Sequence, residues 1–428
     1  MKTSLFRNVP VAPAPSGAAS LLCSNASLST LHKVLGLAIA LLAQSTPAQT
    51  WQTVDDFQYT SGMSAGNYGL AVALNGTLFA GGFGLDSSGV HGLVMASTDS
   101  GNTWSNPLDD FMYPGVSATR YDGGMAVDAN GNVYAAGQAL LNHTLTSRWL
   151  VRRSSDNGST WSTVDDFSLG GTHNQAHAIA ADAAGNVYVA GLASTSTAYG
   201  TYEWVVRKGV NGTSWSTVDD FGPNTSSQAF GVIVHPTAGV FVAGSSLVTV
   251  GRNSFQAWTV RRSLDGGATW NTADTFQLGN VSIARGLGID ARGNLYAVGV
   301  ANETIKGKTR THWIVRKSVN GASGSWATVD DFQLAPDGET IALGFAVDSA
   351  GDLLVVGQGS TSHGGTSQWL VRKNPGGVGA WATVDNFQYV PGSDTEPQAI
   401  AADAAGHVFV GGYGNDASGT SHWLIRKY

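Results

Sequence analysis

The chain has 428 residues, of which 12% are charged, and a formal net charge of −7. Its 56 glycines and 13 tryptophans are typical of many short strands joined by tight turns, and no helical pattern follows residue 50. The acidic balance argues against nucleic acid as a partner.

The first 48 residues differ from the rest. They contain Lys2, Arg7 and Lys33 but no acid, and the ten apolar residues Val34–Ala43 are too few to span a bilayer. We predict an export signal over residues 1–48, cleaved near Ala48, with a membrane anchor as the competing interpretation. The product would be secreted, periplasmic or on the cell surface, without stable membrane insertion.

Removal of this segment changes the chemistry available to the chain. The net charge becomes −10, because three basic residues and no acids are lost. The only cysteine, Cys23, is lost as well. We therefore expect no disulfide, no thiol chemistry and no cysteine-based metal site in the mature chain.

A unit of about 54 residues recurs along the remainder of the chain. Each copy contains a tryptophan before a short acidic segment, as in Trp51-Gln-Thr-Val-Asp-Asp-Phe57. These tryptophans are Trp51, Trp104, Trp161, Trp215, Trp270, Trp326 and Trp381. A period of this length with four strand-like segments per copy predicts a β-propeller.

One copy illustrates the four segments in chain order. Residues 176–182 are small and apolar, as in a buried strand, and a glycine-containing turn leads to the β-branched and aromatic residues 187–191. Residues 203–208 and 215–221 form the third and fourth strands. Together they predict a four-stranded antiparallel blade.

The two ends of the repeat region each carry part of one blade. Residues 51–57 are a fourth strand without its blade, and residues 423–427 are a third strand without its successor. Pairing them removes the last open sheet edge. We therefore predict an all-β, seven-bladed propeller over residues 49–428, closed between its two ends.

The tryptophans fall into two columns. Seven open the fourth strands, and six open the third strands, with Gly92 at the position of the missing one. The regularity of both columns predicts a packing role within or between blades.

A second motif lies between the third and fourth strands. It reads Ser97-Thr-Asp-Ser-Gly-Asn-Thr-Trp104, and it recurs in full before Trp161 and Trp270. It resembles the Asp-box of the sialidase-like (BNR repeat) β-propeller superfamily. In these turns we expect Asp99, Asp156 and Asp265 to accept backbone hydrogen bonds, which is a structural role.

The resemblance also implies a possible activity, namely glycoside hydrolysis of the sialidase kind. In the family this requires three arginines on the substrate carboxylate, a tyrosine nucleophile paired with a glutamate, and an acid/base aspartate. The chain lacks the family's Phe/Tyr-Arg-Ile-Pro segment, and catalytic members have six blades. Both departures favour a non-catalytic protein.

Repeated charges indicate a scaffold. Arginines recur in the third strands at Arg152, Arg207, Arg261, Arg316, Arg372 and Arg426, and paired acids such as Asp165 and Asp166 recur in the fourth strands. Neighbouring strand residues point to opposite faces, so the paired acids cannot form a catalytic dyad. We hypothesise that the two columns pair across each hairpin.

Function is then expected where the copies differ. Five positions before the closing residue of each innermost strand, the copies carry Tyr68, Gly123, His177, Phe230, Arg285, Leu343 and Gln398. Neighbouring loops add Arg120, Tyr121, Asp122, Glu339 and Glu396. This mixture predicts a polar binding basin at the channel face, although unconstrained loop variation would look the same.

We expect an exported, monomeric, non-catalytic propeller that binds a glycan or a protein and needs neither cofactor nor metal. The predicted ligand-binding residues are Tyr68, Arg120, Tyr121, His177, Phe230, Arg285 and Gln398. The alternatives are a sialidase-like or other glycoside hydrolase, with Asp122, Glu339 and Glu396 as candidate carboxylates, and a structural cell-surface module.

Overall fold

A computed structural model describes residues 50–428, apart from 142–145, 198–199, 223–224 and 306. The export signal predicted over residues 1–48 lies outside these described residues. The described part is all-β apart from one short 3-10 turn, η1 (Pro375–Gly377). It contains no helix with the length and apolar character needed to cross a membrane.

Three sheets contain four strands each. Their strands are β1 (Gln52–Phe57), β11 (Asn174–Ala181), β12 (Val187–Ala193), β13 (Glu203–Val210), β14 (Ser214–Phe221), β23 (Thr340–Val347), β24 (Leu353–Gly359), β25 (Gln368–Asn374), β26 (Ala382–Phe387), β27 (Thr395–Ala402), β28 (Val408–Asn415) and β29 (Ser421–Lys427). The strand orders are β11-β12-β13-β14, β23-β24-β25-β26 and β1-β29-β28-β27.

Two larger sheets contain nine and eight strands. The nine are β2 (Ala65–Val72), β3 (Leu78–Asp86), β4 (Gly89–Ser97), β5 (Asp109–Phe111), β6 (Val116–Arg120), β7 (Met125–Val127), β8 (Val133–Leu141), β9 (Ser147–Ser154) and β10 (Ser162–Phe167). The eight are β15 (Gln228–His235), β16 (Gly239–Val250), β17 (Asn253–Ser263), β18 (Asn271–Phe276), β19 (Val281–Ile289), β20 (Leu295–Ile305), β21 (Lys308–Ser318) and β22 (Ala327–Phe332). In each, single parallel pairs join antiparallel meanders, at Val90–Ala118 and Gln256–Val281.

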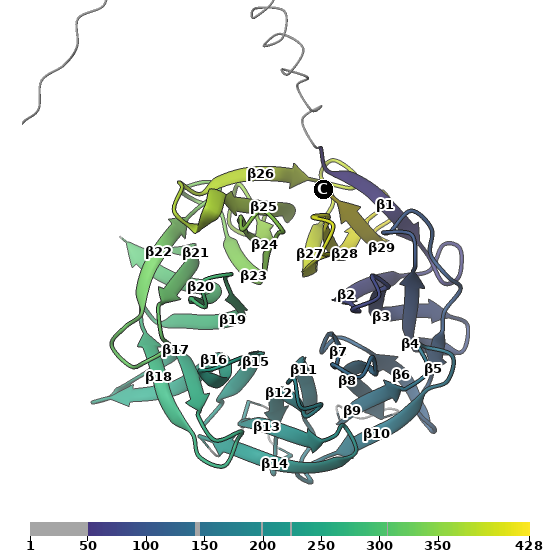
Figure 1. Cartoon of the computed structure of the whole chain (residues 1–428). Helices are drawn as coiled ribbons and strands as arrows, with labels where there is room; N and C mark the ends of the chain where they lie inside the picture. Colours follow the sequence, from purple (N-terminus) through teal and green to yellow (C-terminus); the bar gives the residue numbers. More distant parts are fainter. Residues whose placement is uncertain (1–49, 142–145, 198–199, 223–224, 306) are drawn as a thin grey trace, which may run out of the picture. The chain divides into compact units, whose positions relative to one another are not determined.

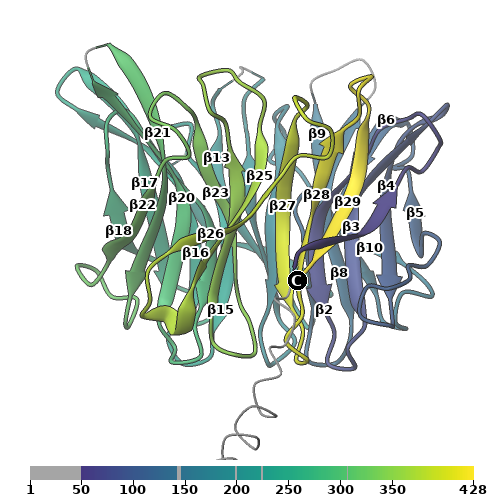
Figure 2. The same ribbon diagram turned by 90° about the horizontal axis from the view of Figure 1, so that it is seen from above.

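The antiparallel meanders stand around a common axis in a propeller-like arrangement (Figure 1). The first strand of each meander, for example β2, β11 or β19, lies nearest the axis, and the last, for example β10, β14 or β22, lies outermost. Seen from a perpendicular direction, the turns gather at the two ends of the strands (Figure 2). Side chains of the innermost strands therefore meet near the axis.

The first and last strands of the described chain belong to one sheet. β1 pairs antiparallel with β29, with Gln52 opposite Lys427 and Phe57 opposite Trp423. Strands far apart in the sequence thus complete one meander.

The tryptophans of the third strands fill the space between successive meanders. Trp149 is fully buried and meets Phe167 of its own meander edge to face, with ring centroids 6.0 Å apart. It also packs on Gly191 of the following meander, where an added Cβ would lie 2.7 Å from the indole. Large residues therefore face glycines across these contacts, which explains why both recur.

The arginine column forms ion pairs, but the hypothesis of pairing across each hairpin is wrong. Arg207 Nε and Nη2 donate to both oxygens of Asp165, at 2.7 and 2.6 Å, and Asp165 lies in the preceding meander. The guanidinium also lies over Phe167, 4.1 Å from its ring centre. The same contact occurs in Arg152–Asp109, Arg261–Asp219, Arg316–Asp274, Arg372–Asp330 and Arg426–Asp385. We call these contacts the arginine clasps; they connect successive meanders.

One aspartate of this series lacks a clasp. In the meander that follows Asp55, the clasp position is taken by Met95, which has the same register in its hairpin (opposite Ala80) as Arg152 has in its own (opposite Ala135). Asp55 Oδ2 is buried without a hydrogen-bond partner among the described residues. Burial, followed by repulsion from Asp56, raises the pKa of Asp55 to about 7. The contact between β1 and the next meander therefore lacks an ion pair that six others have.

Candidate active site

A cavity of about 450 Å³ lies at the axis, between the innermost strands. Tyr68, His177, Phe230, Arg285 and Gln398 all line it, as do Asp122 and Gln175. Five of the seven predicted ligand-binding residues are thus brought together.

β-Bulges explain why these side chains reach the cavity. In β11 the register shifts between Ala176 and Ala178, so His177 is the extra residue. The same shift brackets Tyr68, Phe230, Arg285, Leu343 and Gln398 in their own strands. A bulge releases one residue from the ladder and re-aims its side chain. Six of the seven residues in the variable column are therefore bulged residues around the cavity; the seventh, Gly123, lies between β6 and β7.

On one wall the bulged residues form a stack. The rings of His177 and Phe230 are nearly parallel with centroids 5.0 Å apart, and the Arg285 guanidinium lies 4.2 Å from the Phe230 ring centre. His177 Nδ1 donates to the Ala229 carbonyl at 2.8 Å. Burial lowers the pKa of His177 to about 4, and the nearby Arg285 charge acts in the same direction. His177 is therefore neutral at ordinary pH.

Another wall contains Tyr68 and Asp122; Arg120 does not line the cavity, but it lies close enough for its charge to act on both. Asp122 accepts a 2.7 Å hydrogen bond from Gln138 Nε2, while its Oδ1 is buried without a partner among the described residues. Burial raises the pKa of Asp122 to about 6. Burial also raises the pKa of Tyr68 to about 12, so this hydroxyl is protonated at neutral pH. The Arg120 guanidinium lies over Phe83, 4.5 Å from its centre.

A second cavity of about 180 Å³ lies beside the central cavity. It is lined by residues of β23 and β27 that come two positions before those lining the central cavity. It is lined by Glu339, Asp394 and Glu396, with Gln358, Ser360 and Ser367. His363 Nδ1 lies 2.6 Å from Glu339 Oε1. The exposed fractions of the two side chains are 80% for His363 and 42% for Glu339. This acidic pocket adjoins the central cavity because Glu396 and Gln398 are alternate residues of β27.

One hydroxyl connects two carboxyl groups in the acidic pocket. Ser367 Oγ lies 3.0 Å from Asp394 Oδ1 and 3.0 Å from Glu396 Oε1. A serine hydroxyl has a single hydrogen to donate. One of the two carboxyl groups must therefore be protonated for both contacts to be favourable. Burial is the largest influence on the pKa of Glu396 and raises it, and the Asp394 charge adds to this, so Glu396 takes up a proton more readily than an ordinary glutamate does.

Tyr413 connects the acidic pocket to the central cavity. Its hydroxyl is hydrogen-bonded to Glu396, and its ring stacks near Tyr68 with centroids 6.2 Å apart. Burial, followed by the Glu396 charge, raises the pKa of Tyr413. Asp122 and Glu396 both lie near enough to Tyr68 for their charges to add to the burial that raises its pKa.

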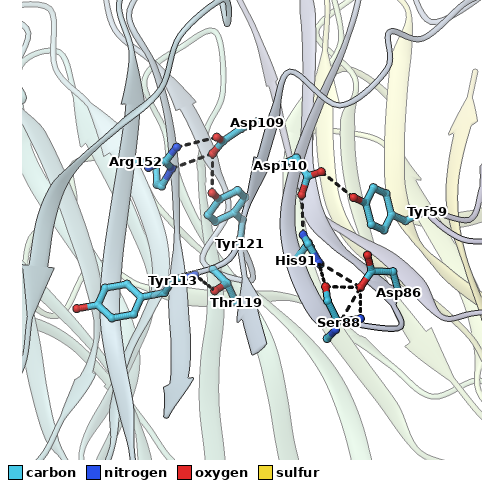
Figure 3. Close-up of polar contacts among 11 residues, drawn as sticks. Tyr59, Asp86, Ser88, His91, Asp109, Asp110, Tyr113, Thr119, Tyr121 and Arg152 are labelled. Carbon is cyan, nitrogen blue, oxygen red and sulfur yellow. Dashed lines mark hydrogen bonds and ion pairs between the residues drawn. The ribbon is translucent and has the colours of Figure 1, made fainter. Parts of the chain in front are cut away.

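The prediction of Tyr121 as a ligand-binding residue is corrected. Tyr121 is fully buried and packs on Gly92, where an added Cβ would lie 2.8 Å from its ring. Its hydroxyl donates to Asp109 Oδ2 at 2.6 Å, alongside the clasp from Arg152 (Figure 3). It takes the place of the tryptophan missing from that column, which is a packing role.

Asp394, Ser367 and Tyr413 are absent from the sequence-based set of site residues. Each lies in a loop or strand that differs among the copies, so no column identifies it. The only signal is the segment Asp394-Thr-Glu396, which places two acids on one face at the start of an inner strand. Their shared contact to Ser367 depends on a loop from another hairpin.

The Ser-x-Asp-x-Gly turns lie apart from both cavities. Asp99 accepts hydrogen bonds from Thr103 N at 2.9 Å and Thr103 Oγ1 at 2.6 Å, and Asp156 and Asp265 repeat the arrangement. The hydroxyl bond and then the backbone bond lower the pKa of Asp99 to about 2. Within the described residues no group of three His, Cys, Asp or Glu side chains has metal-binding geometry.

Comparison with known proteins gives structural likeness only. No protein-family model matches the chain, and no curated protein matches it. A ulvan lyase of polysaccharide lyase family 25 aligns with a TM-score of 0.55 and 12% identity, over 87% of this chain and 95% of that chain. An α-L-arabinofuranosidase from Fusarium graminearum has a TM-score of 0.48 and 12% identity, over 89% and 98%. A protein of unknown function from Dyadobacter fermentans has a TM-score of 0.47 and 12% identity, over 88% of this chain and 98% of that chain.

These comparisons correct the expectation of a non-catalytic propeller. The chain shares its propeller-like fold with the ulvan lyase, an enzyme that cleaves a polysaccharide. At 12% identity this likeness concerns the fold, and it does not single out the sialidase-like family.

Proposed function

We propose that the chain is a glycan-active enzyme, a glycoside hydrolase whose reaction takes place where the acidic pocket meets the central cavity. The proposal includes a ring of seven blades closed by the β1–β29 pair, a member of the sialidase-like superfamily exported by residues 1–48. The meanders around one axis and the shared sheet of the end strands support the ring. The three Ser-x-Asp-x-Gly turns support the superfamily.

The paired carboxyl groups of Asp394 and Glu396 are the observation that carries this function. Their nearer oxygens both contact Ser367 Oγ, so they are at most twice 3.0 Å apart. Retaining glycosidases need carboxyl groups separated by about 5–5.5 Å. Glu396, whose pKa burial raises, would donate a proton to the leaving oxygen, and Asp394 would act as nucleophile. Two acids with opposite protonation in one pocket are the usual arrangement for this chemistry.

Asp122 and Tyr68 would complete the site from the central cavity. Asp122, whose pKa is about 6, is protonated in mildly acidic conditions and can donate to substrate through its unpartnered Oδ1. The neutral Tyr68 hydroxyl can bind a sugar hydroxyl beside it. The stacked Phe230 ring offers an apolar face for a pyranose ring.

The test is cleavage of a polysaccharide panel by the full chain, measured as new reducing ends. Glu396→Gln and Asp394→Asn are each expected to lower kcat by about 100-fold or more, because each removes a proton donor or nucleophile. The control is Asp337→Asn, a largely exposed residue whose ion pair with a described residue is a 3.5 Å contact with Lys308. Full activity in Glu396→Gln would sink the assignment.

Polysaccharide lyase chemistry is the second candidate, favoured by the fold shared with the ulvan lyase and by the neutral His177 beside Arg285. A lyase removes a proton beside a carboxylate, for which a neutral imidazole is a suitable base. It leaves an unsaturated product that absorbs ultraviolet light, whereas hydrolysis does not. Ultraviolet absorbance of the products therefore decides between the two reactions.

A further inference from the structure

Two arginines differ from those of the scaffold: Arg285 lines the central cavity, and Arg120 lies beside it, near Tyr68 and Asp122. The six clasp arginines each hold an aspartate with two hydrogen bonds, whereas Arg120 and Arg285 form no ion pair with a described residue. The Nε atoms of both are buried without a partner among the described residues. Like the clasp arginines, each guanidinium lies over a phenylalanine ring, at 4.5 Å for Arg120 and 4.2 Å for Arg285, but without the aspartate.

Removing an arginine charge from water costs free energy unless a ligand supplies a counter-charge or hydrogen bonds. A buried cation loses hydration, and only a counter-charge or hydrogen bonds restore it. Burial lowers the pKa of Arg285, which reflects this loss of hydration. The phenylalanine fixes the plane of each guanidinium, so its nitrogens are pre-organised for the planar, bidentate contact that carboxylate and sulfate groups accept.

The two arginines come from opposite sides of the axis. Arg120 ends β6 and Arg285 lies at the bulge of β19, and these strands belong to meanders on opposite sides of the ring (Figure 1). They therefore do not form the three-arginine cluster on one carboxylate that the family resemblance implies. Two separate anionic groups are required to satisfy both.

We infer that Arg285 in the cavity and Arg120 beside it form two separate anion subsites, so that the ligand is a glycan with at least two carboxylate or sulfate groups. The inference rests on the proposed function, because it names the substrate class of the same cavity. Asp122 lies beside Arg120 and balances it only in part, since the structure shows no ion pair between them.

The test is binding of defined hexasaccharides to the full chain, measured by calorimetry at low salt. Hexagalacturonate supplies carboxylates, a sulfated maltohexaose supplies sulfates, and maltohexaose is the neutral reference. We expect one or both anionic probes to bind and the neutral one to bind at least about 10-fold more weakly, as the loss of charge-assisted hydrogen bonds implies. Which anionic probe binds identifies the anion. Maltohexaose binding as tightly as both would overturn the inference.

Variants assign the effect to these side chains. Arg120→Gln and Arg285→Gln are each expected to weaken binding of the anionic probe by about 10-fold or more. The matched control is Arg252→Gln, which removes the same charge from the exposed turn after β16 and should change affinity by less than about twofold. Equal losses in all three variants would reduce the effect to net charge and refute the inference. Circular dichroism checks that each variant is folded. If Arg285→Gln misfolds, Arg285→Lys is used in its place. It is also expected to weaken binding, because lysine lacks the planar, two-pronged set of donors of a guanidinium.

The outcomes separate this inference from the proposed function. Anion-dependent binding that needs both arginines, without any cleavage, would uphold the subsites and defeat the hydrolase. Cleavage of neutral glycans that is unchanged in the arginine variants would uphold the enzyme and defeat the subsites.

Discussion

Met95→Arg is expected to supply the missing seventh clasp. Arginine at position 95 would extend toward the unpartnered Asp55 of the preceding meander. Arg152 extends in the same way toward Asp109, which precedes it by one meander. Phe57 follows Asp55 in sequence as Phe111 follows Asp109, so the ring that carries the guanidinium is also present. The substitution therefore copies a contact that the fold makes six times.

The pKa of Asp55 sets the size of the effect. One pKa unit corresponds to about 1.4 kcal/mol, so a rise from 3.8 to about 7 corresponds to about 4 kcal/mol above pH 7. Because the folded value exceeds the unfolded one, this contribution stabilises the fold below pH 4 and is lost as the pH rises to 7. Loss of Met95 packing costs about 2 kcal/mol. We expect a net gain of about 2 kcal/mol at pH 8 and a net loss at pH 4.

Urea unfolding at several pH values between 4 and 8 measures the change in the free energy of unfolding. Hydrogen exchange of the β1 amides reports directly on the contact between β1 and the next meander. Asp55→Asn is the control, since it removes the charge without adding a partner and should also flatten the pH dependence. The reasoning is refuted when the free energy difference between Met95→Arg and the parent chain stays constant from pH 4 to 8.

Three further predictions concern the scaffold and the site. Arg207→Met leaves Asp165 buried and unpaired, so the free energy of unfolding in urea should fall by about 3–5 kcal/mol; a loss below 1 kcal/mol would show that the clasps contribute little. Tyr121→Phe removes the hydroxyl that donates to Asp109, so stability should fall by about 1–2 kcal/mol while glycan binding stays unchanged; weakened binding would restore its predicted ligand role. Asp122→Asn abolishes a titration whose folded pKa of about 6 exceeds the ordinary 3.8, so the parent chain should lose about 2–3 kcal/mol of stability between pH 4 and 7 and the variant should not. Equal pH profiles of the two would contradict the buried environment of Asp122.

The sequence predicts the strands well because each pattern is repeated. The Trp149 column and the turn glycines recur at the same spacing, so they identify the third and fourth strands without any knowledge of tertiary contacts. The partner of a repeated residue is harder to predict. Arg207 has an aspartate in its own hairpin and another in the preceding meander, and only the packing between meanders selects Asp165.

The candidate site is predicted in part for the same reason. A break in a repeated column reveals Tyr68, His177 and Arg285, because neighbouring columns fix their positions. Tyr121 is also a break, yet it compensates for Gly92, and sequence variation alone does not distinguish compensation from function. The Ser367 contact to Asp394 and Glu396 joins loops that have no counterpart in the other copies, so no comparison among them reveals it.

The bulges have a consequence for how such a protein can change. A residue that stands outside the ladder of hydrogen bonds carries its side chain to the axis while its neighbours hold the strand in register. Exchanging Arg285 or His177 for another type leaves every rung of the sheet in place. New recognition properties can therefore be obtained by combining substitutions at one position per inner strand, and a library restricted to these positions would explore ligand preference at little risk to folding.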